Sequence, residues 1–236
     1  IINKKAFKQY KVNINDLKKL TTKQTEVMQS NMYYIDKIYW LVEDCKRFGT
    51  YPFVGLARCG FIAIDILKSF VDEKILSDNE RDLFLQNIKT IASHIQIDSY
   101  KLSKKKFVKK YGHIRPNSYE ITSKNYEEGY DLYFKKNKII KNHKIKKFQF
   151  SNKQIKKISK FIKRNNLKLN FKQLISFMQN SIIYREYAKY VFTKSIDNIF
   201  EIIKFIGKRH SISLEDLSYL RIQLILDLYY TLSFRN

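Results

Sequence analysis

Residues 111–122 read YGHIRPNSYEIT, and in this segment a chain that otherwise follows a helical pattern must leave the helix. Pro116 disfavours helical geometry at Arg115 and removes a backbone donor, while Gly112 permits backbone dihedral angles that other residues avoid. An imidazole, a guanidinium, a phenol and a carboxylate can therefore converge here instead of spiralling round an axis. These groups belong to His113, Arg115, Tyr119 and Glu120.

The rest of the chain favours helix. Only 6 Gly and 2 Pro interrupt 236 residues, and Leu, Ile, Phe and Tyr recur at helical intervals, with a hydrophobic fraction of 44%. We predict an all-α fold, an irregular multi-helix bundle with one long non-helical loop at about 112–125. We expect a single helical substrate-binding domain over 1–236, with subparts 1–134 and 151–236 joined by a lysine-rich connector at 135–150.

Several helix boundaries can be placed from capping residues and breakers. Asn15 is a candidate N-cap for a long helix that should end near Phe48, where Gly49 and Pro52 break the pattern. Apolar spacing predicts a central helix over about 53–73. Further N-caps are expected at Ser77, with Glu80 completing a capping box, and at Ser103, Ser151, Asn170 and Ser213.

Two apolar stripes are expected to face inward on the helices that follow such caps. After Ser77 we expect one helix carrying Leu83, Phe84, Ile88, Ile91 and Ile95. After Ser213 we expect a final helix with Leu217, Leu220, Leu224 and Leu228 facing the core.

The formal net charge is +24, from 46 basic and 22 acidic residues. Such an excess ordinarily points toward nucleic acid. Here it is mostly lysine in a chain crowded with Asn and Ile, the composition that an adenine- and thymine-rich genome gives to any protein. We therefore attribute it mainly to solvated faces and consider nucleic acid an unlikely partner. The alternative is a basic helical nucleic-acid-binding or protein-docking module, with Lys153, Lys156, Lys157, Lys160 and Lys163 on one helix.

Cysteine usage and hydropathy bear on location. Cys45 and Cys59 have neither metal-ligand spacing nor the density of a disulfide scaffold, so a reducing cytoplasm fits best and no metal site is expected. No segment approaches the roughly 20 apolar residues needed to span a bilayer. The chain lacks an initiating methionine, so we expect it to be part of a longer polypeptide.

His113 and Arg115 project to the same side if the segment is extended. The guanidinium could then hold a carboxylate or phosphoryl oxygens in bidentate fashion, and the imidazole could donate a hydrogen bond or move a proton. The alternative is purely structural. Arg115 would tie the loop to a core acidic residue, and His113 would be satisfied by the backbone.

Two further groups of charges are candidate anion contacts. Arg58 lies in an otherwise apolar helix start and should need a partner, either a substrate carboxylate or one of Asp65, Glu43 and Asp44. In the segment REYAKYVF, the charges of Arg185, Glu186 and Lys189 are flanked by aromatic residues, so some should line a cleft.

Four blocks in order carry a family resemblance: GTYPFVGLAR, YGHIRPNSYEIT, REYAKYVF and LEDLSYL. Together they resemble the central substrate-binding helical domain of phosphoenolpyruvate-synthase-like and rifampicin-phosphotransferase-like enzymes, and most closely the L-glutamine kinases of capsular phosphoramidate biosynthesis. The similarity covers about 39–228, most of the chain, and is more specific for the domain than for the acceptor.

The resemblance implies a kinase or phosphotransferase mechanism in which ATP charges a histidine on another domain of the same polypeptide. That domain carries the phosphoryl group to a small-molecule acceptor, with L-glutamine suspected. Arg58, Arg115 and Arg185, with Glu186 and Lys189, would bind the acceptor, and His113, Tyr119 or Glu120 would orient or deprotonate it. No cofactor is expected on this domain alone, whereas ATP and Mg are expected for the full-length enzyme. His94 lacks the paired glycines that precede a phosphohistidine.

Overall fold

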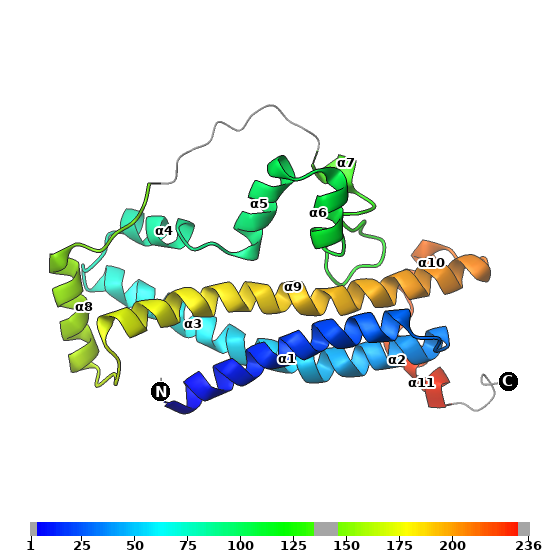
Figure 1. The fold of residues 1–236 in the computed structure, drawn as a ribbon, viewed down its shortest axis with the longest axis horizontal. Coiled ribbons are helices and arrows are strands. Elements are labelled where there is room, and N and C mark those ends of the chain that lie inside the picture. The colour runs from blue at the N-terminus through cyan, green and yellow to red at the C-terminus, as the bar shows by residue number, and fades with distance from the viewer. Residues whose placement is uncertain (1–3, 135–145, 231–236) are drawn as a thin grey trace. The chain divides into compact units, whose positions relative to one another are not determined.

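The structure, a computed structural model, describes residues 4–134 and 146–230, and this part of the chain is helical with no β-strand, as predicted (Figure 1). The elements are α1 (Lys4–Gln29), α2 (Tyr34–Cys45), the π-helical η1 (Lys46–Thr50), α3 (Tyr51–Asp72), α4 (Asp78–Gln86), α5 (Ile91–Lys101), α6 (Lys104–Tyr111), α7 (Tyr130–Tyr133), α8 (Asn152–Arg164), α9 (Phe171–Arg209), α10 (Leu214–Ser218) and α11 (Ile222–Tyr230).

The chain folds into two compact units that are interleaved in sequence. The first unit comprises residues 1–14, 53–96 and 137–188, and the second comprises 15–52, 97–136 and 189–236. Each unit therefore draws on both sides of the expected connector, of which residues 135–145 lie outside the described part. The long helix α9 contributes its N-terminal part to the first unit and its C-terminal part to the second.

The core of the first unit forms where α3, α4, α8 and the N-terminal part of α9 bring apolar side chains together. Phe70 of α3 meets Phe161 of α8 edge to face, with ring centroids 5.3 Å apart. Met178 of α9 is completely buried in the same cluster. The other buried members are Ala63, Leu67, Ile75, Leu76, Phe84, Ile88, Ile158, Ile162, Leu174 and Phe177.

The second unit has its own core, to which five helices contribute. α1 supplies Val27, α2 supplies Ile38 and Leu41, α10 supplies Leu217 and α11 supplies Leu226. α9 supplies Ile199, Ile202 and Ile203, and the segment between α6 and α7 supplies Ile121.

The predicted N-caps are confirmed at several helices. Ser77 and Ser151 each form a full capping box. The serine hydroxyl accepts a hydrogen bond from the backbone N–H of Glu80 or Gln154, and the side chain of that residue accepts one from the backbone N–H of the serine. Ser213 accepts from the backbone of Asp216 at the start of α10. These bonds satisfy backbone N–H donors that the first helical turn leaves unpaired. The starts of these helices could therefore be predicted from the capping residues alone.

The predicted first helix is wrong at both of its boundaries. α1 begins well before Asn15, and the region predicted as one helix is broken between α1 and α2. Gly49 does not end a helix, because the chain passes through η1 directly into α3, whose second residue is Pro52. A Cβ at Gly49 would lie 2.9 Å from both Leu20 Cδ2 and Phe192 Cβ. Close packing, rather than chain breaking, explains this glycine.

Two predicted apolar stripes are also wrong in part. The helix that begins after Ser77 ends at Gln86, and α5, which carries Ile91 and Ile95, has no buried residue. The final helix is split into α10 and α11, so Leu220 and Leu224 are exposed and Leu226 is buried instead.

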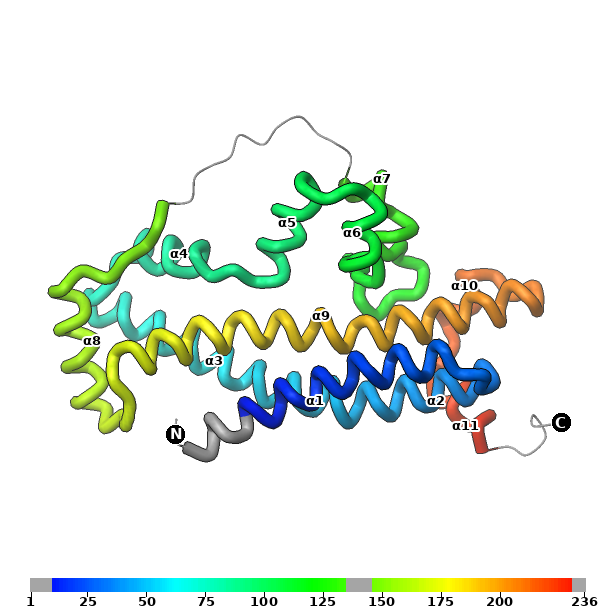
Figure 2. The backbone as a smooth tube through the Cα atoms, viewed as in Figure 1, coloured from blue at the N-terminus to red at the C-terminus, as the bar shows by residue number. Residues whose placement is uncertain are grey.

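The trace in Figure 2 shows α9 as one uninterrupted helix that begins directly after the predicted N-cap Asn170 and ends at Arg209. No described helix combines the length and the apolar character that crossing a membrane would require. The elements that carry the predicted site residues are thus α3, α9 and the irregular segment between α6 and α7.

Candidate functional site

The irregular segment at 112–129, hereafter the motif segment, is a compact structure in the second unit. It is closed by backbone hydrogen bonds from Tyr126 N to Ile114 O at 2.7 Å and from Glu127 N to Gly112 O at 3.2 Å. Gly112 has ordinary right-handed helical dihedral angles, with φ of −53°, so its predicted conformational role is wrong. A Cβ there would lie 2.6 Å from Val108 O, which explains why a glycine is needed.

Arg115 is buried, with 3% of its surface exposed. Its guanidinium forms an ion pair with Asp197 of α9 and donates to Ser123 O at 2.7 Å. Phe200 lies beneath the guanidinium, with its ring centroid 5.0 Å away. The structure thus places Arg115 in the structural arrangement that the sequence had left as the alternative, with the loop tied to a core acidic residue.

Asp197 is surrounded by donors. Asn125 Nδ2 donates to the same carboxylate oxygen as Arg115, at 3.1 Å. Burial raises the pKa of Asp197, and the hydrogen bonds from Arg115 and Asn125 act in the opposite direction. An anion-binding role for Arg115 would require this ion pair to open, so that role remains a prediction.

His113 is held against α9. Its Nε2 lies 3.0 Å from the backbone oxygen of Tyr190, and since that oxygen can only accept, Nε2 carries the proton. Burial lowers the pKa of His113 to about 4. The imidazole is therefore neutral at neutral pH and is a weak base there.

Tyr119 and Glu120 lie at the surface of the second unit, beside a hollow of about 120 Å³. Glu120 Oε1 accepts a hydrogen bond from Thr122 Oγ1 at 3.0 Å. The hollow has an apolar floor that includes Ile121, Phe200, Ile203, Leu217 and Ile225. Among the predicted catalytic groups, Tyr119 and Glu120 are exposed, whereas His113 is partly buried.

Arg185 occupies a different setting in the first unit. It is half-buried on α9, and its guanidinium lies 5.1 Å from the ring centroid of Phe61 of α3. α3 can approach Arg185 closely because Gly60 has no side chain. A Cβ at Gly60 would be only 3.1 Å from Arg185 Cδ. Within the described part of the chain, no carboxylate pairs with Arg185. Arg185 is thus a positioned cation that has no counter-ion among the described residues.

Arg58 lies one turn before Phe61 on the same helix, so both share a face of α3. Arg58 was expected to need a partner, either a substrate carboxylate or a protein carboxylate, but its side chain is exposed and water can solvate the charge. Two of the carboxylates considered as its partners pair elsewhere, Asp44 with Lys23 at 3.8 Å and Glu43 with Lys46 at 2.7 Å. Arg185 therefore lies against the half-exposed ring of Phe61, and Arg58 lies one turn earlier on the same face of α3.

Arg58, Phe61 and Arg185 are hereafter called the platform. Two buried hydroxyl groups lie on helices close to it. Ser181, one turn before Arg185 on α9, is fully buried, and its Oγ has no hydrogen-bond partner among the described residues. The hydroxyl of Tyr10 is also buried and unpaired in the described structure, and its ring meets Tyr184 edge to face at 5.2 Å. Burial raises the pKa of Tyr10. Sequence reasoning missed both residues, because an isolated Ser or Tyr within a helix forms no motif.

The predicted site residues fall into two sets. Arg58, Arg185 and the half-buried Glu186 belong to the first unit, while Lys189, which is exposed, belongs to the second. His113, Arg115, Tyr119 and Glu120 belong to the second unit as well. Their convergence on one acceptor therefore remains a prediction.

The described side chains include no group of three or more His, Cys, Asp or Glu arranged to hold a metal ion. Comparisons with protein-family models, curated proteins and solved structures found no match for this chain.

Proposed function

We propose that this chain is the acceptor-substrate-binding domain of an ATP-dependent phosphotransferase, in which a phosphohistidine on another domain of the same polypeptide transfers its phosphoryl group to an acceptor bound here. L-glutamine, phosphorylated on its amide nitrogen, is the proposed acceptor. The observation that carries the proposal is Arg185, a half-buried guanidinium stacked on Phe61 with no carboxylate partner among the described residues.

The chemistry of this platform suits an anionic group. A guanidinium presents a planar fork of donors that matches a carboxylate or a phosphoryl group, and stacking on a ring leaves the edge of that fork open. Arg58, one turn from Phe61, adds a second positive charge on the same face of α3. An acceptor carboxylate would bind to Arg185, and Arg58 would steer it there.

An amino acid also needs a partner for its ammonium group. Glu186 is half-buried and pairs with no cation within the described residues, so it would accept that group. The hydroxyls of Tyr10 and Ser181, which lack partners in the described structure, would accept or donate hydrogen bonds if polar atoms of an acceptor or water reached them.

An amide nitrogen is a poor nucleophile, so a positioned base matters. Tyr119 and Glu120 are the exposed candidates, and a general base typically contributes ~10²- to 10⁴-fold. His113, whose pKa is lowered to about 4, would position the motif segment instead. ATP and Mg would act on the domains that charge the phosphohistidine, and positive groups here would stabilise charge on the transferred phosphoryl group.

The test is phosphoryl transfer by the full-length polypeptide that contains this chain, followed by ³¹P NMR with ATP and L-glutamine. We expect a phosphoramidate product, and we expect Arg185→Ala to lower kcat/KM by at least about tenfold, the effect of losing one charged hydrogen-bonded contact. Arg209→Ala is the matched control, since Arg209 also lies over an aromatic ring, that of Phe205 at 5.7 Å.

Either of two results would contradict the proposal. One is the absence of any acceptor-dependent product with L-glutamine and related amino acids. The other is an Arg185→Ala enzyme with unchanged kinetics.

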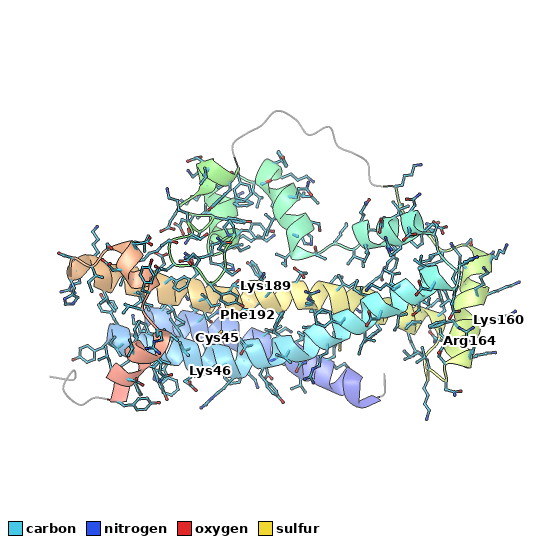
Figure 3. All side chains as sticks on the ribbon, turned by 180° about the vertical axis from the view of Figure 1, so that it is seen from behind. Cys45, Lys46, Lys160, Arg164, Lys189 and Phe192 are labelled. Atoms are coloured by element: carbon cyan, nitrogen blue, oxygen red, sulfur yellow. The ribbon has the colours of Figure 1, made fainter. Side chains whose placement is uncertain are left out.

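A second candidate function, nucleic-acid binding, is favoured by one feature of the first unit. α8 is strongly amphipathic, and its exposed face carries Lys153, Lys156, Lys160 and Lys163, with Lys160 and Arg164 labelled in Figure 3. Retention on duplex or single-stranded nucleic acid at about 0.15 M salt, falling steeply as salt rises, would support it. If the chain is not retained at all at about 0.15 M salt, nucleic-acid binding is excluded.

A further inference from the structure

A cavity of about 370 Å³ lies in the second unit, where the start of α2, the end of α9 and α11 meet. Its volume falls within the range of sites that bind small molecules, roughly 300–1,000 Å³. Aromatic and aliphatic side chains dominate the wall. The lining residues are Tyr33, Tyr34, Ile35, Asp36, Ile206, His210, Leu228 and Tyr229.

Packing outside the cavity fixes two of its tyrosine rings. Tyr229 stacks face to face on Tyr39, with centroids 3.8 Å apart and ring planes inclined by 2°. Tyr34 packs against Phe205 with centroids 4.9 Å apart. The rings are therefore placed before any ligand arrives, which reduces the entropy cost of binding.

Among the described residues that line the cavity, Asp36 is the only one with a carboxylate. It is half-buried in the first turn of α2 and forms no ion pair with any described residue. The neighbouring Lys37 does not neutralise it, because Lys37 Nζ donates to the backbone oxygen of Met28 at 3.1 Å. The cavity thus combines a negative charge with tyrosine faces, whose quadrupoles also attract cations.

We infer that this cavity binds a small organic cation, namely an ammonium group attached to a flat or apolar body. The ammonium group pairs with Asp36, and the apolar body packs against Tyr34 and Tyr229. This site is independent of the phosphotransferase proposal, because none of its residues belongs to the platform at Arg58 and Arg185.

The experiment is isothermal titration calorimetry of the whole chain with a matched pair of probes. 2-Phenylethylammonium carries the positive charge, and 2-phenylethanol has the same ring and chain length without it. We expect the cation to bind at least about fivefold more tightly, in line with one cation–π contact and one ion pair at a half-exposed site. Tyr34→Leu should weaken binding of both probes.

Asp36→Asn is the decisive variant, since it keeps the shape of the side chain and removes only the charge. We expect it to abolish the preference for the cation while circular dichroism shows an unchanged fold. Asp78→Asn is the control, because Asp78 also occupies the first turn of a helix but lies in the first unit. The inference is overturned if the two probes bind equally to the unmodified chain, if neither binds, or if Asp36→Asn retains the preference.

Discussion

The guanidinium of Arg115 is engaged on several sides inside the second unit. Ser123 O and Asp197 accept its hydrogen bonds, Glu201 lies 3.6 Å away and Phe200 covers one face. These contacts join the motif segment to α9. A buried ion pair such as that of Arg115 with Asp197 destabilises the fold strongly when one partner is removed and the other stays buried. Truncating one partner therefore tests the pair.

We predict that Arg115→Ala lowers the free energy of unfolding by about 3–5 kcal/mol, because it leaves the Asp197 carboxylate buried without its ion-pair partner. Urea denaturation of the chain measures this. Arg81→Ala is the control, since Arg81 pairs with Asp78 and Asp82 at the surface, where solvent screens the charges, and its removal should change the stability much less. A stable Arg115→Ala chain whose parent enzyme has lost turnover would instead assign Arg115 to the substrate.

His113 makes stability depend on pH in a defined direction. Its pKa in the folded chain, about 4, is below the ordinary value of 6.5, so the unfolded chain takes up a proton first as the pH falls. Its contribution is complete above pH 6.5 and is lost as the pH falls toward 4. The loss is at most about 3 kcal/mol, from 1.36 kcal/mol per pKa unit.

His113→Gln isolates this contribution, because glutamine can still donate to Tyr190 O but does not titrate. We expect the stability difference between the two chains to shrink from pH 7 to pH 4.5 in urea denaturation. A constant difference across that range would show that the imidazole titrates normally in the folded chain.

At the scale of the elements, the capping boxes of α4 and α8 are joined. Gln154 Nε2 donates to Glu80 Oε1 at 2.9 Å, so the N3 residue of one box contacts the N3 residue of the other. The start of α8 is therefore fixed both by its own cap and by a neighbouring helix of the first unit.

We predict that Ser151→Ala costs about 1 kcal/mol, the usual effect of removing a side-chain cap. Ser103→Ala is the matched control, because Ser103 is the N-cap of α6 but forms no side-chain capping bond. It should change stability by less than about 0.5 kcal/mol. Thermal unfolding followed by circular dichroism compares them, and equal shifts for both would contradict the prediction.

Helix type and several helix starts could be predicted from the sequence, because caps and 3.6-residue periodicity act over one or two turns. The residues at which helices end were harder to predict from the sequence. Gly49 resembles a breaker but is required by contact with Leu20 and Phe192, which are distant in sequence. The ion pair of Arg115 with Asp197 was foreseeable only as a type of contact, since nothing local identifies its partner.

At the scale of the whole molecule, each unit is assembled from three separated stretches of chain. The core of the first unit combines Phe70 and Phe84 from the first half of the sequence with Phe161 and Met178 from the second. In the second unit, Ile38 and Leu41 pack with Ile199 and Leu226. A cut in the middle of the sequence therefore divides both cores rather than separating two domains.

We predict that fragments 1–134 and 146–236 do not fold independently, although the sequence pattern marks a boundary between them. Each fragment lacks part of both apolar clusters, and half a core cannot offset the conformational entropy lost on folding. Circular dichroism should show reduced helicity and no cooperative thermal transition for either fragment alone. An equimolar mixture should recover much of the helicity of the intact chain. Cooperative unfolding of the isolated fragment 1–134 would show that its helices need no partner from the second half.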